Sequence, residues 1–432
     1  MPKRFHLGWF CNFSVGEWNE TLSSADPRWD GQAYIDLAQA LESACFDYMM
    51  IEDTLMVSEA YGGTAKTTLA HAIQAPKGDP VPLTVLALHA TRHLGVVATM
   101  STTAYPPFLL ARLASTVDSL SGGRFGWNIV TSGEDAAAQN FGLDKLPPRE
   151  ERYDMADEFV EVVSRLFESW DRDAVVLDRA RAVYADADKV RPIDFQGKYF
   201  KVRGPLNTAP SPQGRPVYVQ AGGSPRGREF AARTADSIVA PANGLNGMKA
   251  FREDIRARAA AAGRDPDAIK ILFLVYPFLG DTAEEAQARY RRMVEATPFV
   301  EAALASVGSI TDIDFSKFDL DQELPRLTTN GESASLDKFA QWGSGKTLRQ
   351  LAADRFESGL ELIGTPEEVA GKMEAAMAEI GGDGFLLSTP FQRLNRRATA
   401  EICEGLVPVL QRRGLTRARY EHKLLRDTLK EF

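Results

Sequence analysis

Residues that build metal centres and disulfide frameworks are scarce in this sequence. Its 432 residues include only 3 cysteines, Cys11, Cys45 and Cys403, and 5 histidines. The cysteines are too few and too scattered for a disulfide framework or a zinc motif. His89 and His93 are four residues apart but lack the glutamate of a His-Glu-x-x-His motif. We therefore expect no metal site, and buried cysteines in a reducing compartment.

An excess of positive charge and long apolar runs are also lacking. The formal net charge is -9, and no basic stripe with interleaved aromatic residues is present, which argues against nucleic-acid binding. No run approaches the roughly 18 apolar residues of a membrane helix, and the first residues lack the apolar core of a secretory signal. The composition, 44% hydrophobic and 25% charged, is that of a globular protein, expected in the cytoplasm.

Short apolar segments alternate with amphipathic helical patterns along the chain. This alternation predicts a parallel sheet with right-handed crossovers, and eight such units predict a (β/α)8 TIM barrel. An open doubly wound sheet is the alternative, although its usual glycine-rich turn does not follow the first strand. The predicted strands are Phe5–Phe10, Tyr48–Glu52, Gly95–Met100, Arg124–Val130, Val217–Ala221, Ser237–Ala240, Ile271–Tyr276 and Gly384–Ser388.

Three long segments exceed what a minimal barrel needs. We expect one domain over residues 1–432 with insertions near 55–82, 171–216 and 298–354, the second containing a β-hairpin through Tyr199–Arg203. Loops of this length in a compact domain are commonly lids or binding elements. The mixed-charge ending, near residues 412–432, could form an arm that reaches another subunit.

Residues 220–227, Gln-Ala-Gly-Gly-Ser-Pro-Arg-Gly, follow the fifth predicted strand. Ser224 suits the N-cap of a helix and Pro225 its first position. Gly223 allows a close approach to the backbone, so unpaired N–H groups and the helix dipole favour a phosphate here. One phosphate site late in a barrel fits a mononucleotide, whereas a plain helix cap is the alternative reading.

The most informative stretch is Ser-Gly-Gly-Arg-Phe-Gly-Trp-Asn-Ile-Val-Thr-Ser at 121–132, which predicts a turn, a buried strand and a polar strand end. With Asn-Phe-Gly at 140–142, it resembles the bacterial-luciferase-like flavin monooxygenases, in the branch of the nitrilotriacetate, dibenzothiophene sulfone and long-chain alkane monooxygenases. Further motifs extend the resemblance over nearly the whole chain: Glu-Arg-Tyr at 151–153, Gly-Lys-Tyr-Phe-Lys-Val-Arg-Gly-Pro at 197–205, Ser-Pro-Gln-Gly-Arg-Pro at 211–216, Asp-Gly-Phe at 383–385 and Val-Pro-Val-Leu-Gln-Arg-Arg-Gly at 407–414.

The resemblance implies an FMN site. It places Asp53 beside the isoalloxazine ring, a hydroxyl residue of the third strand against the flavin, and a tyrosine at the phosphate. The positions that it implies for cofactor binding are Asp53, Thr99, Thr103, Asn128, Arg149, Tyr153, Gly223 and Ser224. Arg149 stands where the branch usually has histidine. Arginine can pair with phosphate but cannot serve as a base near neutral pH.

A second departure concerns the loop after the first strand. Many relatives have Trp-Arg-His-Pro there, whereas residues 16–20 of this chain are Gly-Glu-Trp-Asn-Glu, so we expect a different substrate. Candidates for the substrate pocket follow the early strands or lie in the first long loop, although loop packing would equally explain each of them. They are Phe10, Asn12, Ser14, Trp18, Leu55, Tyr61 and His71.

The resemblance implies a two-component monooxygenase. Reduced FMN (FMNH2) would arrive from a separate NAD(P)H:flavin reductase and react with dioxygen, and one oxygen atom would enter a small organic substrate by oxidation of a C–N, C–S, C–halogen or C–H bond. The cofactor carries this chemistry, so no side chain is assigned a catalytic role. A homodimer or homotetramer is expected. A deazaflavin-dependent barrel oxidoreductase and a non-catalytic flavin-binding relative are the alternatives.

Overall fold

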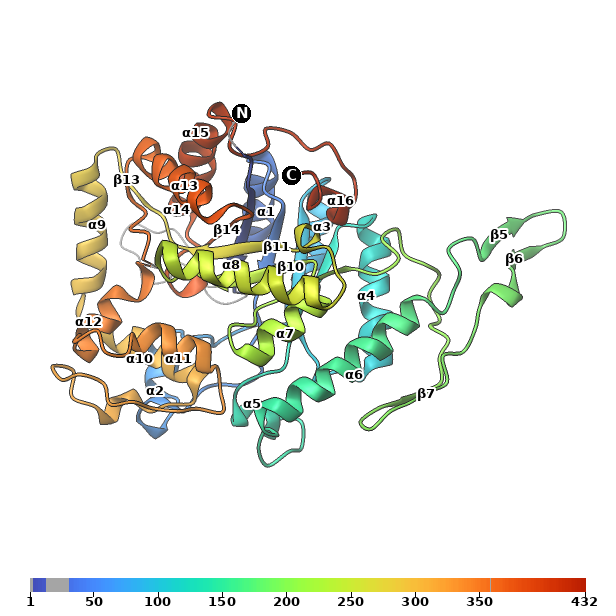
Figure 1. The fold of residues 1–432 in the computed structure, drawn as a ribbon, viewed down its shortest axis with the longest axis horizontal. Helices are drawn as coiled ribbons and strands as arrows, with labels where there is room; N and C mark the ends of the chain where they lie inside the picture. The colour runs from blue at the N-terminus through green and yellow to red at the C-terminus, as the bar shows by residue number, and fades with distance from the viewer. Residues whose placement is uncertain (1–2, 13–30, 358) are drawn as a thin grey trace.

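Eight parallel strands close into a barrel at the centre of the protein. The structure is a computed structural model, and it describes residues 3–12, 31–357 and 359–432. The strand order around the barrel is β1-β14-β11-β10-β9-β4-β3-β2. Figure 1 shows helices packed around these strands. The predicted TIM barrel is therefore confirmed, and the open sheet is wrong. Its strands are β1 (His6–Cys11), β2 (Tyr48–Ile51), β3 (Gly95–Ser101), β4 (Phe125–Val130), β9 (Val217–Gln220), β10 (Ser237–Pro241), β11 (Lys270–Val275) and β14 (Gly384–Leu387).

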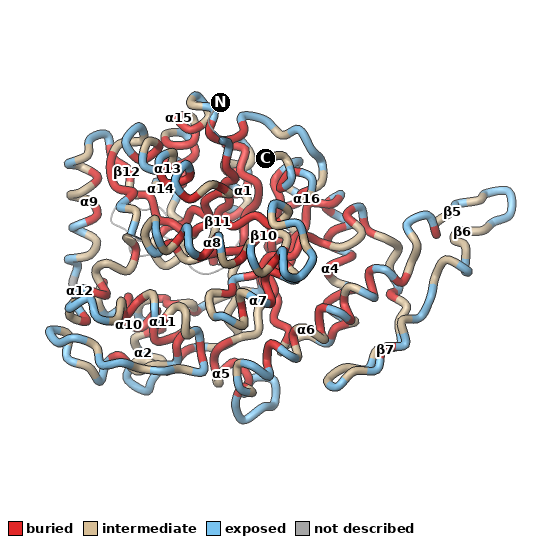
Figure 2. Tube along the Cα trace, in the orientation of Figure 1, coloured by how far each residue is buried: buried red, intermediate tan, exposed pale blue. Residues whose placement is uncertain are grey.

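Burial explains why these short segments are strands. Nearly every strand residue is inaccessible to solvent, because one face of the barrel packs inward and the other lies against helices (Figure 2). Valine, leucine and methionine from alternate positions fill the interior, as in other barrels of this size. The surrounding helices include α1 (Gln32–Ser43), α3 (Pro80–Ala90), α4 (Pro107–Ser121), α6 (Arg149–Phe167), α7 (Pro225–Thr234), α8 (Gly244–Ala261), α13 (Pro366–Ile380) and α15 (Val407–Arg412).

The first two long segments differ in character. Residues 55–82 contain the short helix α2 (Lys66–Ala70). Residues 171–216 form two antiparallel hairpins, β5 (Val175–Asp178) with β6 (Val183–Ala185), and β7 (Phe195–Gln196) with β8 (Lys201–Val202). Both hairpins project away from the barrel, and β5–β6 is largely exposed (Figures 1 and 2).

The third segment folds into a helical layer. After α9 (Ala283–Glu295) come α10 (Thr297–Thr311), α11 (Ser333–Ala340) and α12 (Leu348–Ala353), grouped at one end of the molecule (Figure 1). They enclose a hydrophobic core of their own, separate from the barrel cores. Its buried residues include Phe299, Leu304, Val307, Phe315, Leu336, Phe339, Leu348, Leu351 and Phe356.

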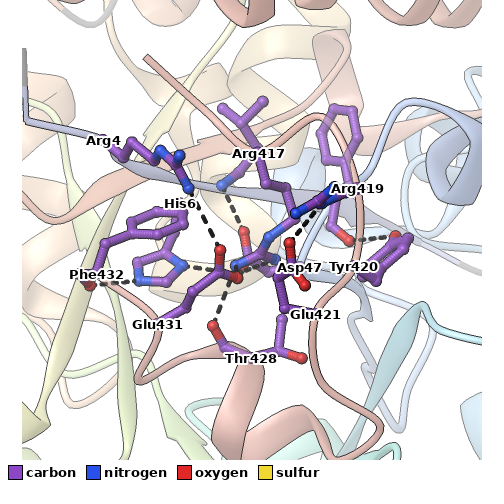
Figure 3. Close-up of polar contacts among 12 residues, drawn as sticks. Arg4, His6, Asp47, Arg417, Arg419, Tyr420, Glu421, Thr428, Glu431 and Phe432 are labelled. Atoms are coloured by element: carbon purple, nitrogen blue, oxygen red, sulfur yellow. Dashed lines mark hydrogen bonds and ion pairs between the residues drawn. The ribbon is translucent and has the colours of Figure 1, made fainter. Parts of the chain in front are cut away.

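The C-terminal segment packs beneath its own barrel. Leu425, at the start of α16 (Leu425–Thr428), and Leu429 join the buried interior cluster. Above them Asp47 accepts a hydrogen bond from Arg417 (2.8 Å) and contacts His6 (2.6 Å), in the network of Figure 3. Burial alone would raise the pKa of Asp47, but Arg417 and His6 hold it below its usual value. The sequence suggested an arm onto another subunit; here the segment closes the amino end of the barrel of the same chain.

Helix length and polarity also bear on the membrane question. Throughout the described ranges, every helix is either too short or too polar to cross a lipid bilayer.

Candidate functional site

A cavity of about 810 Å³ opens at the carboxyl ends of the barrel strands. This edge is where the ends of parallel strands converge and where barrel proteins bind their ligands. The helical layer covers the cavity from the other side, with residues 331–341 among its walls. Nine residues predicted from the sequence line this cavity: Phe10, Asp53, Leu55, Thr99, Asn128, Arg149, Tyr153, Gly223 and Ser224.

The floor of the cavity carries hydrogen-bonding groups of the barrel strands. Asn128 Nδ2 of β4 donates to Thr99 Oγ1 of β3 over 2.9 Å. Asn128 Oδ1 is buried without a hydrogen-bond partner, and so is Gln220 Oε1 at the end of β9. Because an unpaired buried acceptor is costly, these two oxygens indicate a ligand that brings hydroxyl or N–H donors.

Three hydroxyl groups interact beside this floor. Ser101 Oγ lies 2.8 Å from both Thr103 Oγ1 and Ser132 Oγ. Ser101 and Ser132 line the cavity, whereas Thr103 does not. The predicted Thr103 is therefore placed behind the two serines, and it orients them rather than facing the cavity itself.

A small polar cradle lies where α7 begins. Ser224 is the N-cap, and its hydroxyl accepts from the Gly227 N–H over 3.1 Å, with Pro225 at the first helical turn as predicted. A Cβ on Gly227 would lie 2.6 Å from the Tyr153 hydroxyl, so glycine permits this approach of α6 and α7. Burial raises the pKa of Tyr153, which keeps its hydroxyl protonated and able to donate.

The two arginines of α7 are already engaged in ion pairs. Arg226 contacts Asp157 at 2.5 Å, and Arg228 contacts Asp254 at 3.0 Å. The positive character of the cradle therefore comes from backbone N–H groups and the helix dipole.

Arg149 and Arg152 hold the helical layer onto the barrel. Arg149 Nη2 donates to the carbonyls of Thr329 and Gly331, both at 2.8 Å. Arg152 Nη2 donates to the carbonyl of Asn330 at 2.9 Å. The departure from histidine at position 149 thus places a guanidinium that binds two carbonyls over the cavity, and Arg152 binds the carbonyl between them.

Two carboxyl groups in the cavity wall have strongly raised pKa values. Burial raises the pKa of Asp53 to about 7, against the opposing charge of Lys77, which itself pairs with Glu52 at 2.6 Å. Burial, helped by the charge of Glu332, raises the pKa of Glu134 to about 7. Both groups can therefore hold or release a proton near neutral pH.

The remaining pocket candidates lie elsewhere. Asn12 donates to the carbonyl of Phe391 at 2.9 Å, and His71 lies 3.4 Å from Glu301; neither of them lines the cavity. Tyr61 packs against the core of the helical layer and is not part of the wall either. Ser14 and Trp18 fall outside the described residues.

Several polar wall residues were not among the individual site residues assigned from the sequence. Ser132 stands at the polar strand end of the most informative motif, and Gln220 opens the predicted anion-binding segment 220–227, so the sequence did indicate both. Arg152 belongs to the Glu-Arg-Tyr motif at 151–153, and the others come from the long segments or follow strand ends without a motif. These residues are Ser101, Arg152, Glu134, Tyr276, Glu332, Lys338, Arg355 and Gln392.

Comparison with known proteins adds independent information. The model of the family described as luciferase-like monooxygenase matches residues 5–384. The chain is 37% identical to dibenzothiophene-sulfone monooxygenase of Rhodococcus erythropolis (strain XP), over 99% of this chain and 96% of that protein.

Two solved structures have the same fold over their whole length. Long-chain alkane monooxygenase matches with a TM-score of 0.87 and 33% identity, over 99% of this chain and 96% of that one. Riboflavin lyase, solved with modified FMN and riboflavin, matches with a TM-score of 0.87 and 30% identity, over 100% and 96%. These matches confirm the branch indicated by the sequence motifs.

Proposed function

Because this chain belongs to the luciferase-like monooxygenase family, we propose that it is the oxygenating component of a two-component, FMNH2-dependent monooxygenase. A separate NAD(P)H:flavin reductase supplies the reduced flavin. The overall reaction consumes dioxygen and two electrons, places one oxygen atom in a small organic substrate and releases the other as water. The observation that carries the proposal is the cavity at the barrel mouth, which joins a phosphate cradle to unpaired acceptors.

The residues of the cavity fit FMN. Tyr153, Ser224 and the N–H groups from Gly223 onward suit its single terminal phosphate. The orphan oxygens of Asn128 and Gln220 suit the hydroxyl donors of a ribityl chain. Thr99 and Asp53 extend the wall beyond them, where the family resemblance puts the isoalloxazine ring.

The flavin, when bound, supplies the electrons and the oxygen chemistry. The chain's own residues bind it, orient the substrate and keep bulk water out. The hydrogen bonds from Arg149 and Arg152 to the carbonyls of residues 329–331 hold the helical layer over the cavity. This layer keeps water away from reactive species. Asp53 and Glu134, with pKa values of about 7, are two groups able to hold a proton beside the cavity.

An anaerobic titration tests the proposal. The purified chain is titrated with FMNH2, reduced riboflavin and a reduced deazaflavin, and is then mixed rapidly with oxygenated buffer. We expect the tightest binding for FMNH2, and a transient absorbance distinct from that of oxidised flavin. Preference for the deazaflavin, or equal weak binding of all three without a transient, would sink the proposal.

A conservative variant sharpens this test. Tyr153→Phe removes only the hydroxyl next to Ser224, so its affinity for FMNH2 should fall by about tenfold while its affinity for reduced riboflavin is unchanged. Tyr184→Phe, on the exposed hairpin, is the matched control and should behave like the wild-type chain in both titrations.

Assembly and location stay predictions. The projecting β5–β6 hairpin exposes Val176, Leu177 and Tyr184, and an exposed apolar patch of this kind supports a homodimer or homotetramer. A single monomeric species in sedimentation at micromolar concentration would contradict this. The expected cytoplasmic location rests on the sequence.

A further inference from the structure

The part of the cavity beneath the helical layer carries two cationic side chains that form no ion pair with a carboxylate of the described residues. Lys338 lies on α11 and Arg355 in the turn Asp354–Phe356, and both line the cavity. The Lys338 side chain makes no hydrogen bond or ion pair with any residue in the described ranges. Arg355 donates to the Ser306 hydroxyl (2.8 Å) and the Ala303 carbonyl (3.3 Å), both neutral groups.

Two carboxylates lie near the pair. Asp354 forms an ion pair with Lys346 at 2.6 Å. Glu332 accepts from the Ser335 hydroxyl at 2.6 Å, and its charge acts on Arg355 without a contact at ion-pair distance. Burial, together with the nearby positive charge of Arg355, lowers the pKa of Lys338 to about 8. Two unpaired cations in an enclosed space repel each other, and an anion placed between them would remove that cost.

Apolar side chains also line this region. They come from the end of β11 and the residue after it, and from the helical layer: Leu274, Tyr276, Val307, Phe339 and Leu351. A wall in which charged groups converge beside apolar side chains can fix the orientation of a small ligand.

We propose that Lys338 and Arg355 form a subsite for an anionic group, a carboxylate, sulfonate or sulfinate, on the otherwise apolar substrate of the oxygenation reaction. This inference rests on the proposed function and names the substrate class. Arg355 can bind such a group through two N–H donors and Lys338 as a point charge. The anion orients the substrate, so that its apolar part extends toward the flavin site.

The flavin phosphate is a second anion that Lys338 could reach. Ala334, one helical turn before Lys338 on α11, lies close enough to the phosphate cradle that a Cβ on Gly223 would sit 2.5 Å from its Cβ. The subsite nevertheless belongs to the substrate, because Arg355 follows α12 and donates to Ser306 and Ala303 of α10, whereas the cradle lies between β9 and α7. The test separates the two anions.

The test is calorimetric and uses one matched pair of probes. The FMN-saturated protein, and in parallel the flavin-free protein, is titrated with 1-hexanesulfonate and with 1-hexanol, which share the alkyl chain and differ in charge. We expect the wild-type chain to bind the sulfonate about tenfold more tightly than the alcohol. Lys338→Met should lose about tenfold in sulfonate affinity, and Lys338→Arg should recover most of it.

Two controls accompany these variants. The affinity for 1-hexanol should be equal in all of them, and Lys249→Met, an exposed lysine on α8, should bind both probes like the wild-type chain. The preference of the wild-type chain for the sulfonate needs no variant, so it stays informative if a substitution prevents folding.

Three results would overturn the proposal. They are equal or absent binding of the sulfonate relative to the alcohol in the wild-type chain, unchanged sulfonate affinity in Lys338→Met, and a selective loss of FMN over riboflavin affinity in that variant. The last result would assign the lysine to the flavin phosphate. Because the flavin-free protein is titrated too, failure of the anion subsite is distinguishable from failure of flavin binding.

Discussion

Asn128 and Thr99 are joined across the barrel floor, with Asn128 Nδ2 donating to Thr99 Oγ1 over 2.9 Å. This bond fixes the amide of a residue that lines the cavity, and the amide oxygen is buried without a hydrogen-bond partner. The pair explains why a polar asparagine stands in the middle of an otherwise apolar strand. An apolar side chain at position 128 would pack better, but the asparagine provides an acceptor that is already oriented. Such pre-orientation lowers the entropic cost of binding a ligand.

Replacing Asn128 should therefore weaken flavin binding more than it weakens the fold. In Asn128→Ala we expect the affinity for FMNH2 to fall about tenfold, because a ribityl donor loses its acceptor. The free energy of unfolding should change by less than about 1 kcal/mol, since an unsatisfied oxygen is removed along with the bond to Thr99. Anaerobic titration and urea unfolding measure the two quantities. Unchanged flavin affinity together with a large loss of stability would show a purely structural role.

The hydrogen bonds of Arg149 should hold the segment between α10 and α11 closed over the cavity. Arg149→Ala removes two hydrogen bonds to the carbonyls of Thr329 and Gly331, so the segment between α10 and α11 should open more often. We expect native-state proteolysis within residues 325–335 to accelerate several-fold, and bound flavin to dissociate faster. Arg165→Ala, at an exposed position on the same helix, is the control. Equal cleavage rates in both variants would contradict this role of Arg149.

The barrel was predictable because its signal is local. Each strand is a short apolar segment followed by a helical pattern, and all eight were predicted to within two residues of their observed ends. The Ser224 cap and the glycines around it were equally visible, since cap chemistry depends on neighbours in sequence. Thr365 and Glu368 form a full capping box at the start of α13, which is likewise a local pattern.

The helical layer was harder to predict, because its order depends on contacts between distant residues. Arg149 is held by carbonyls about 180 residues further along the chain, and no local pattern predicts such a pairing. Lys338 and Arg355 gave no sequence signal for the same reason, since single cations in a polar segment are usually solvated. The position of the C-terminal segment likewise follows from burial of Leu425 and Leu429 under the barrel.

The raised pKa of Asp53 predicts a pH-dependent stability. Its carboxyl has a pKa of about 7 in the folded chain, against 3.8 normally, through burial and the charges of Asp79 and Glu52, with Lys77 opposing. The folded state therefore binds more protons than the unfolded state between about pH 4 and 7, and stability falls as the pH rises through this window.

Asp53→Asn removes the cost of ionising a buried carboxyl group. At pH 8 the variant should be more stable than the wild-type chain by about 1–2 kcal/mol, after allowance for partial exposure, and the gap should vanish near pH 4. Urea unfolding from pH 4 to 8 measures this difference in stability. Glu295→Gln, at an exposed position, is the control and should match the wild-type chain at both pH 4 and pH 8. A variant less stable than wild type at pH 8 would show that the Asp53 carboxylate is paired there.

The buried pair of Arg417 and Asp47 should be the strongest electrostatic contribution at the amino end of the barrel. Both side chains are about 1% exposed, and their atoms lie 2.8 Å apart (Figure 3). In Arg417→Met, Asp47 keeps its burial but loses its main cationic partner, which should destabilise the fold by about 3 kcal/mol. The depressed pKa of Asp47 should rise, so the loss should be greatest at neutral pH and should shrink as acid protonates the carboxyl.

Two further variants separate this buried pair from surface charge. Arg419→Met, two residues along the same segment, removes a side chain that is 82% exposed and should change stability by less than about 0.5 kcal/mol. Adding Asp47→Asn to Arg417→Met should restore part of the loss, because the uncompensated buried charge is gone. Thermal and urea unfolding give both comparisons. If Asp47→Asn lowered the stability by the same amount in the Arg417→Met variant as in the wild-type chain, the two residues would act independently. The segment would then be held by the packing of Leu425 and Leu429.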